Sequence, residues 1–168
     1  MSVRPCPGTP DEQLYGSYSM CLSESGGQLE FPAVLLMNTQ WIAMLPGAPN
    51  HLPLEAIHVE GSHGELEASI PLTHPGVRRQ PTRAHVDSGT TYVYLPTRAY
   101  YALRRAMNEV IGRTCSRPNS GCEGWSNPGT DSCIYLPKGP QGLKSLPTIQ
   151  FQFQRQRVTW MPHSYMVW

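Results

Sequence analysis

The sequence predicts a mainly β domain with one clear helix, and three observations lead to this fold class. Fifteen glycines and seventeen prolines among 168 residues indicate many tight turns. Eight tyrosines and four tryptophans favour short strands over a helical bundle. Only one segment keeps the 3.6-residue period of an amphipathic helix, whereas several alternate with the period of a strand. The length allows one domain with its own core.

The N-terminal quarter predicts a loose segment followed by a hairpin. Residues 1–17 are polar and rich in Pro and Gly, which indicates a lead-in without regular structure. Residues 19–31 predict two short strands with a turn at Gly26-Gly27, and Pro32 ends the second strand or confines it to an edge. A further buried strand is expected over residues 39–45, closed by the turn residues Pro46 and Gly47.

The middle of the chain predicts three strands around a solvated loop. Residues 54–61 alternate over their second half, with Ile57 and Val59 on one face and His58 and Glu60 on the other. Residues 62–81 are rich in turn formers and are expected to be loop. Residues 82–86 and 92–95 are each expected to form a strand, one on either side of a polar turn.

The clear helix is predicted over about residues 97–111, and strands follow it. Pro96 suits a first-turn position, and Gly112 suits the residue just beyond the helix. Six apolar residues keep the helical period: Ala99, Leu103, Ala106, Met107, Val110 and Ile111. Residues 113–131 form a Cys-, Gly- and Pro-rich excursion. Strands are then expected at residues 132–136, 149–153, 158–160 and 165–168.

Charge and cysteine usage exclude several function classes. A net charge of +1 gives no basic face for nucleic acid, and no apolar run reaches the roughly twenty residues of a membrane helix. The first residues lack the apolar core of a signal peptide, so a secretory signal would have to lie on other sequence.

One or two disulfides are favoured over a metal site, and no zinc module fits the cysteine spacing. The disulfide candidates are Cys21, Cys115, Cys122 and Cys133.

The residues that carry chemistry centre on Asp87, in the run Val86-Asp87-Ser88-Gly89-Thr90-Thr91. A catalytic carboxylate needs a strand that delivers it, a glycine that allows a sharp turn, and small hydroxyl residues that hydrogen-bond it. This run supplies all three. Asp, Ser and Gly also make ordinary hairpin turns, but here an apolar segment, Pro96 and a helix follow in order.

Residues 82–112 resemble the second catalytic-aspartate region of the pepsin-like aspartic proteases, in which a strand, Val-Asp-Ser-Gly-Thr-Thr, Leu-Pro and a helix follow one another. Together with weaker matches, the resemblance covers about residues 19–168. Within the family, the sequence most resembles the plasmepsin V-type apicomplexan processing proteases. It implies the C-terminal lobe of a double-β-barrel fold. The weaker matches are residues 20–29, the pattern Leu54, Ile57, Val59 and Gly61, residues 146–153, and the pattern Trp160, Pro162 and Tyr165.

The resemblance implies a role for each residue of the motif. Asp87 would be one of two catalytic carboxylates, Gly89 would donate its backbone N–H to that carboxylate, and Thr90 would donate its hydroxyl. Ser88 would lock against its counterpart in the other lobe, and Thr91 would lie beside the substrate backbone. The implied activity is endopeptidase hydrolysis of a peptide or protein in the secretory-pathway lumen or outside the cell, without a cofactor.

The departures from the family pattern open a second hypothesis. The chain has no first Asp-Thr/Ser-Gly motif and no N-terminal lobe with its flap, and the apolar-apolar-Gly segment that packs behind the second aspartate in that family would be expected only after Trp168. Phe31-Pro32-Ala33 replaces the usual Gly-Gly run, and His85 replaces a common apolar residue. Residues 18–168 are therefore expected to be an incomplete C-terminal lobe, which is either half of an active protease or a catalytically silent module for binding or assembly. A homodimer of two Asp87 half-sites would require the missing segments to be dispensable.

Two other site classes are less favoured. Five of the six histidines lie at mixed spacings without a helical His-x-x-x-His pair, so surface positions are expected instead of metal ligands. They are His51, His58, His63, His74 and His85. His85 would modulate the pKa of Asp87 if its ring turned inward. Ser88, Thr90 or Ser132 with a histidine would suggest a serine hydrolase, but Gly-x-Ser-x-Gly is absent.

Overall fold

The computed structural model describes most of the chain as two compact units. The described residues are 19–23, 26–30, 42–48, 50–72, 81–87, 92–126 and 134–166. One unit comprises residues 1–41 with 87–89, and the other comprises residues 42–86 with 90–168. The arrangement is mainly antiparallel sheet with few helices, which confirms the predicted mainly β class.

The first unit contains the predicted hairpin. Strands β1 (Ser19–Ser23) and β2 (Gly26–Glu30) pair antiparallel, with Ser23 opposite Gly26. The expectation of a turn at Gly26-Gly27 was wrong, because both glycines lie within β2 and the connection is residues 24–25. Gly27 lies opposite Leu22 in the register.

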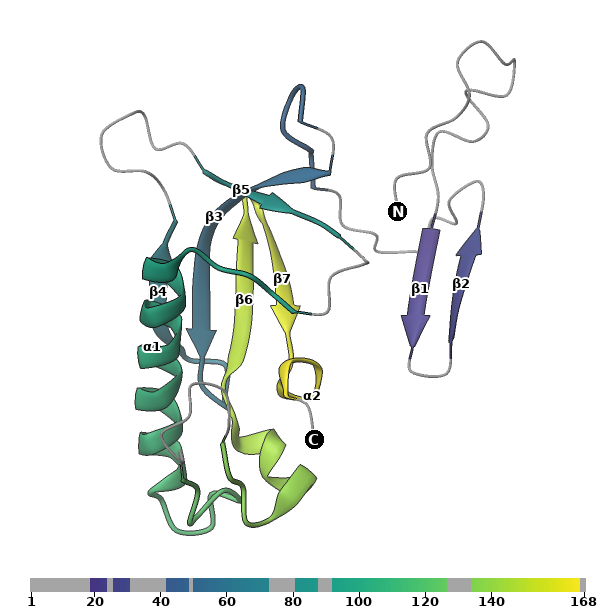
Figure 1. Cartoon of the computed structure of the whole chain (residues 1–168). Helices are drawn as coiled ribbons and strands as arrows, with labels where there is room; N and C mark the ends of the chain where they lie inside the picture. Colours follow the sequence, from purple (N-terminus) through teal and green to yellow (C-terminus); the bar gives the residue numbers. More distant parts are fainter. Residues whose placement is uncertain are drawn as a thin grey trace. The chain divides into compact units, whose positions relative to one another are not determined.

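The second unit is built on a five-stranded sheet in which every pairing is antiparallel (Figure 1). The order is β4-β3-β6-β7, and β5 pairs with the first half of β3. Leu54 pairs with both β5 and β6, so β5 lies on the same side of β3 as β4. The strands are β3 (His51–Glu60), β4 (Leu66–Pro71), β5 (Thr82–His85), β6 (Thr148–Phe153) and β7 (Gln156–Trp160).

Strand β3 is the centre of the sheet, and its two faces differ. Ile57 and Val59 are fully buried on the apolar face, as their alternation predicts. A register irregularity between Leu54 and Ala56 shifts the alternation, so Leu54 also lies in the core. His58 is on the opposite face, as predicted, but it too is buried.

Helix α1 (Thr97–Cys115) packs its apolar stripe on β3 and β4. It begins where predicted, with Pro96 at the N-cap position, but it runs four residues past the predicted end. Gly112 is therefore inside the helix and is not the residue beyond it. The helix ends at Cys115, and the C-cap residue Ser116 donates its hydroxyl to the Gly112 carbonyl oxygen at 2.5 Å. The apolar stripe alone does not show where the last turn stops.

Other expectations for irregular regions were wrong. Residues 66–71, expected as loop, form β4. Residues 42–45 are not a buried strand, since Met44 is exposed and the segment leads into the Pro46-Gly47 turn; residues 39–41 lie outside the described residues. Instead of a strand at residues 132–136, the described part makes one isolated bridge, Tyr135 with Ser126. The strand expected at residues 165–168 is not seen in its described part, because Tyr165 ends the short helix α2 (Pro162–Tyr165) and Met166 is irregular; residues 167–168 lie outside the described residues.

The core of the second unit consists of three groups of buried residues along α1. We name them the sheet cluster, the middle cluster and the disulfide cluster. The 3-10 segment η2 (Gly139–Ser145) helps to close the disulfide cluster. The sheet cluster is Leu54, Ile57, Leu72, Ala99, Ile149 and Phe153; the middle cluster is Val59, Ala106 and Val110; the disulfide cluster is Ile111, Cys115, Cys122, Leu136, Leu143 and Leu146.

Candidate functional site

Strand β5 leads directly into Asp87, and backbone and side-chain hydrogen bonds at the two ends of β5 hold this strand in place. The Val86 N–H donates to the Asn50 carbonyl oxygen at 3.0 Å, which extends the pairing of β5 with β3. At the other end of β5, the Thr82 hydroxyl donates to the Leu72 carbonyl oxygen. The chain therefore reaches Asp87 from an anchored strand, and Asp87 itself is exposed.

The other residues of the predicted catalytic turn are not among the described residues. Ser88, Gly89, Thr90 and Thr91 all fall in the gap between residues 87 and 92. Their predicted hydrogen bonds to the carboxylate of Asp87 therefore stay predictions.

The segment that follows the turn differs from its expectation. Residues 92–95 were expected to form a strand but are irregular, and Tyr92 and Tyr94 are 69% and 79% exposed. The tyrosine- and valine-rich composition favours a strand only where a neighbouring strand is available. Among the described residues no strand pairs with this segment.

A histidine pair lies across the first half of β3 and β5. His51 and His85 are directly opposite in the register, and their ring centroids are 4.9 Å apart. His85 is exposed and His51 is half-buried. The sequence contains no signal for this contact, because the strand predicted from it begins at residue 54, after His51.

The polar face of the sheet carries a second group of chemistry-bearing side chains. His58 on β3 lies opposite Ser69 on β4 and Gln150 on β6. The Gln150 amide donates to the Glu60 carboxylate at 2.7 Å, and the Arg157 Nε donates to the Gln152 amide oxygen at 2.7 Å. Side chains from three neighbouring strands are thereby tied together.

His58 is the buried titratable group of this face. The side chain is 8% exposed, and its Nδ1 has no hydrogen-bond partner. Burial lowers the pKa of His58, Arg157 lowers it further, and Glu60 opposes the shift. The ring is therefore held in its neutral form more strongly than an exposed imidazole.

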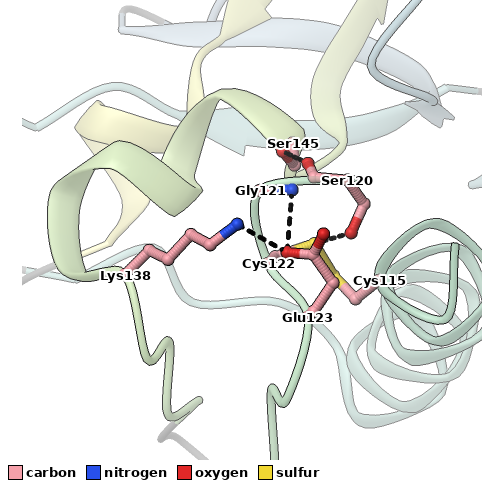
Figure 2. A network of polar contacts seen from close by, with 7 residues as sticks. All are labelled: Cys115, Ser120, Gly121, Cys122, Glu123, Lys138 and Ser145. Atoms are coloured by element: carbon pink, nitrogen blue, oxygen red, sulfur yellow. Dashed lines mark hydrogen bonds and ion pairs between the residues drawn. A yellow bond between two sulfur atoms is a disulfide. The ribbon is translucent and has the colours of Figure 1, made fainter. Parts of the chain in front are cut away.

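A turn of polar residues surrounds the Cys115–Cys122 disulfide at the end of α1 (Figure 2). Cys115 and Cys122, two of the four disulfide candidates, form a bonded pair. Cys133 and the side chain of Cys21 are outside the described parts of the chain. The Ser145 hydroxyl donates to the Ser120 carbonyl oxygen, so η2 is tied to the loop that the disulfide closes.

Glu123 is the charged residue at the centre of this turn (Figure 2). Its carboxylate accepts from the Lys138 ammonium group at 2.8 Å and from the Gly121 N–H at 3.1 Å. The hydrogen bond from Lys138 is the main reason that the pKa of Glu123 is lowered to about 2. Both contacts are made to Oε2 and join Lys138 to the loop that the disulfide closes, which makes the turn a structural element.

Neither a metal cluster nor a membrane helix is found in the part of the chain that the structure describes. No group of three or more His, Cys, Asp or Glu side chains there is placed to hold an ion. No described helix has the length and apolar character needed to cross a bilayer.

Comparisons with protein-family models, with curated proteins and with solved structures found no match. The molecule is thus defined by its own features, as a mainly β protein with an exposed aspartate at the end of an anchored strand. Carboxylates act in hydrolytic sites as general bases or as members of carboxylate pairs, and Asp87 is of this residue type.

Proposed function

We propose that Asp87 is one catalytic carboxylate of an aspartic endopeptidase. One observation carries the proposal: an anchored strand, the run Asp87-Ser88-Gly89-Thr90-Thr91, Pro96 and α1 follow one another in the order typical of the pepsin-like family. The mainly β arrangement and the disulfide agree with a secreted protease lobe. The lobe assignment rests on the motif resemblance and on this order of elements.

The proposed chemistry requires a second carboxylate. Two aspartates hold a water molecule; one accepts a proton from it, and the other donates a proton to the scissile carbonyl oxygen. Two carboxylates this close do not both ionise readily, so they share one proton. Asp87 would supply one member, and an N-terminal lobe would supply the other together with part of the peptide-binding cleft.

Activity measurements test this proposal. The 168-residue chain alone is expected to show no proteolysis, because it carries one motif aspartate. A longer product of the same locus that contains a second Asp-Thr/Ser-Gly motif is expected to cleave peptides at acid pH and to be inhibited by a statine-type inhibitor. Asp87→Asn should reduce its kcat at least about a thousandfold, and Glu109→Gln on the exposed face of α1 should leave it unchanged.

The same measurements separate the alternative, a silent lobe used for binding or assembly. The presence of a single catalytic motif favours this alternative. If the locus encodes no second motif and Asp87→Asn changes no activity, the protease proposal fails. If the 168-residue chain alone cleaves peptides and Asp87→Asn abolishes cleavage, a second lobe is not required. The active site is then formed by two copies of Asp87 in a homodimer.

A further inference from the structure

The histidine pair on β3 and β5 occupies the closer of the two kinds of antiparallel position. The Val86 N–H bonds to the Asn50 carbonyl oxygen, so Asn50 and Val86 form a hydrogen-bonded pair. Pair types alternate along an antiparallel ladder, and His51 and His85 are the next pair, so theirs is a non-hydrogen-bonded pair. Side chains at such positions are closest to each other, about 4.5–5.5 Å between Cβ atoms.

The distance between the two rings matches that of two imidazoles on one ion. A metal–nitrogen bond of about 2.1 Å places the ion roughly 3.2 Å from each ring centroid. For nitrogen–metal–nitrogen angles of about 90–110°, the centroids are then about 4.5–5.2 Å apart. The observed separation between the ring centroids of His51 and His85 is 4.9 Å, which lies within this range.

We propose that His51 and His85 form a two-histidine site for a divalent first-row transition metal ion. Imidazole nitrogens favour Cu²⁺, Ni²⁺ and Zn²⁺ over the hard ions Mg²⁺ and Ca²⁺. Arg83 is exposed two residues before His85 and opposite Pro53, and its charge opposes a bound cation. The site therefore holds its ion reversibly, with water completing the coordination.

Metal binding at this site would stabilise the pairing of β5 with β3. Strand β5 has four residues and ends two positions before Asp87. An ion bound by one ligand from each strand stabilises their pairing, since it binds the folded pair better than the separated strands. The site is independent of the proposed protease function, because neither histidine belongs to the catalytic motif.

Metal titration of the intact chain tests the site. The protein is prepared without a polyhistidine tag and with its free thiols alkylated, so that neither competes for Zn²⁺ or Ni²⁺. We expect one bound ion per chain and shifts in the His51 and His85 ring resonances that occur together, with His63 unaffected. At about 100 times Kd, Zn²⁺ should raise the midpoint of thermal unfolding by about 5–10 °C.

Single substitutions identify the ligands. His85→Asn and His51→Asn should each weaken binding at least about tenfold and abolish most of the thermal shift, since one imidazole is a poor chelator. His63→Asn, in the exposed turn after β3, is the matched control and should bind as the original chain does. Circular dichroism in the absence of metal checks that all three variants are folded.

The proposal is overturned by either of two results. One is that His85→Asn binds with unchanged affinity. The other is that the ring resonances of His51 and His85 in the original chain do not move at a roughly tenfold excess of Zn²⁺ or Ni²⁺. The second measurement needs no variant, so a folding defect in a variant does not leave the question open.

Discussion

The residues on the polar face of the sheet share hydrogen bonds, and His58 is the one that is buried among them with an unsatisfied Nδ1. Glu60, Gln150, Gln152 and Arg157 find partners on neighbouring strands. A buried polar atom without a partner is costly, and protonation of the ring adds the cost of a buried charge. His58 is therefore one position at which pH acts on the fold.

We expect the stability of the chain to fall as the pH is lowered from about 6.5, and His58 to cause part of this fall. The pKa of His58 is lowered in the folded state from its ordinary value of 6.5, mainly by burial. The unfolded chain then binds more protons between the folded pKa and 6.5, so the free energy of unfolding rises with pH in this window. The contribution is fully present above pH 6.5 and is lost as the pH falls toward the folded pKa.

Urea unfolding between pH 7.5 and pH 5 measures this effect in His58→Gln, which keeps a polar side chain but cannot be protonated. The variant should lose less stability on acidification than the original chain. His63→Gln, at an exposed position, should show the same pH dependence as the original chain. An identical slope for His58→Gln and the original chain would show that His58 does not titrate in this window.

At the scale of elements, the end of α1 is decided by residues beyond the helix. Gly112 is helical, and a Cβ added there would meet Trp125 at 3.7 Å, an ordinary contact distance. Gly112→Ala should therefore increase the free energy of unfolding by about 0.5–1 kcal/mol, because glycine loses more backbone entropy in a helix than alanine. Thermal and urea unfolding measure the change.

A matched glycine nearby should respond in the opposite direction. Gly121 has a φ of +89°, and an added Cβ would lie 2.9 Å from the Ser145 hydroxyl oxygen. Gly121→Ala should lower the free energy of unfolding by about 1–2 kcal/mol. If Gly112→Ala were as destabilising as Gly121→Ala, the helix would have to end near residue 112, as the sequence suggested.

The Cys115–Cys122 bond should contribute measurably to the stability of the same region. It joins residues separated by seven positions, and a closed loop of this size restricts the unfolded chain by about 2 kcal/mol. Cys115→Ser and Cys122→Ser should therefore lose similar amounts, since each removes the same bond, with faster amide exchange in the last turn of α1. A loss below about 0.5 kcal/mol in both variants would contradict this role.

The elements that the sequence predicted are those whose signal is local. Strand β6 alternates Ile149, Phe151 and Phe153 with glutamines, and α1 keeps its apolar stripe, so both were found. Strand β4 has the weakly apolar sequence Leu66–Pro71 and is a strand because β3 pairs with it, which a single-sequence pattern does not show. The strand expected at residues 92–95 does not form, because no described strand pairs with this segment although its composition favours a strand.

The candidate sites divide in the same way. Asp87 was found from neighbouring residues, because its turn is encoded in one short run. The contact between His51 and His85 joins residues 34 positions apart and depends on the register of two strands. The burial of His58 depends on both neighbours of β3. Such sites require the pairing of strands to be known before they can be recognised.

At the scale of the second unit, α1 connects all of the buried clusters. Ala99 belongs to the sheet cluster, Val110 to the middle cluster, and Ile111 and Cys115 to the disulfide cluster. A continuous helix transmits loss of packing in one cluster to the others, because its hydrogen-bonded turns form and break cooperatively. We therefore expect this unit to unfold as one cooperative body, although its clusters are distinct.

Substitution of one fully buried residue in each outer cluster tests this expectation. Ile57 in the sheet cluster and Ile111 in the disulfide cluster are both 0% exposed. Ile57→Ala and Ile111→Ala should each cost about 3 kcal/mol, the range for a buried isoleucine that leaves a cavity. Val158→Ala, at a position 42% exposed on β7, is the control and should cost less than about 1 kcal/mol.

Amide hydrogen exchange then distinguishes cooperative from local unfolding. If the unit is cooperative, Ile111→Ala should speed exchange of the protected β6 amides, such as that of Phe151, by the same factor as the amides of α1, because both open in the same global event. If the clusters are independent, only the amides of residues 111–146 will exchange faster and the β6 amides will keep their rates. That outcome would make the disulfide cluster a separately unfolding module attached to the sheet through α1.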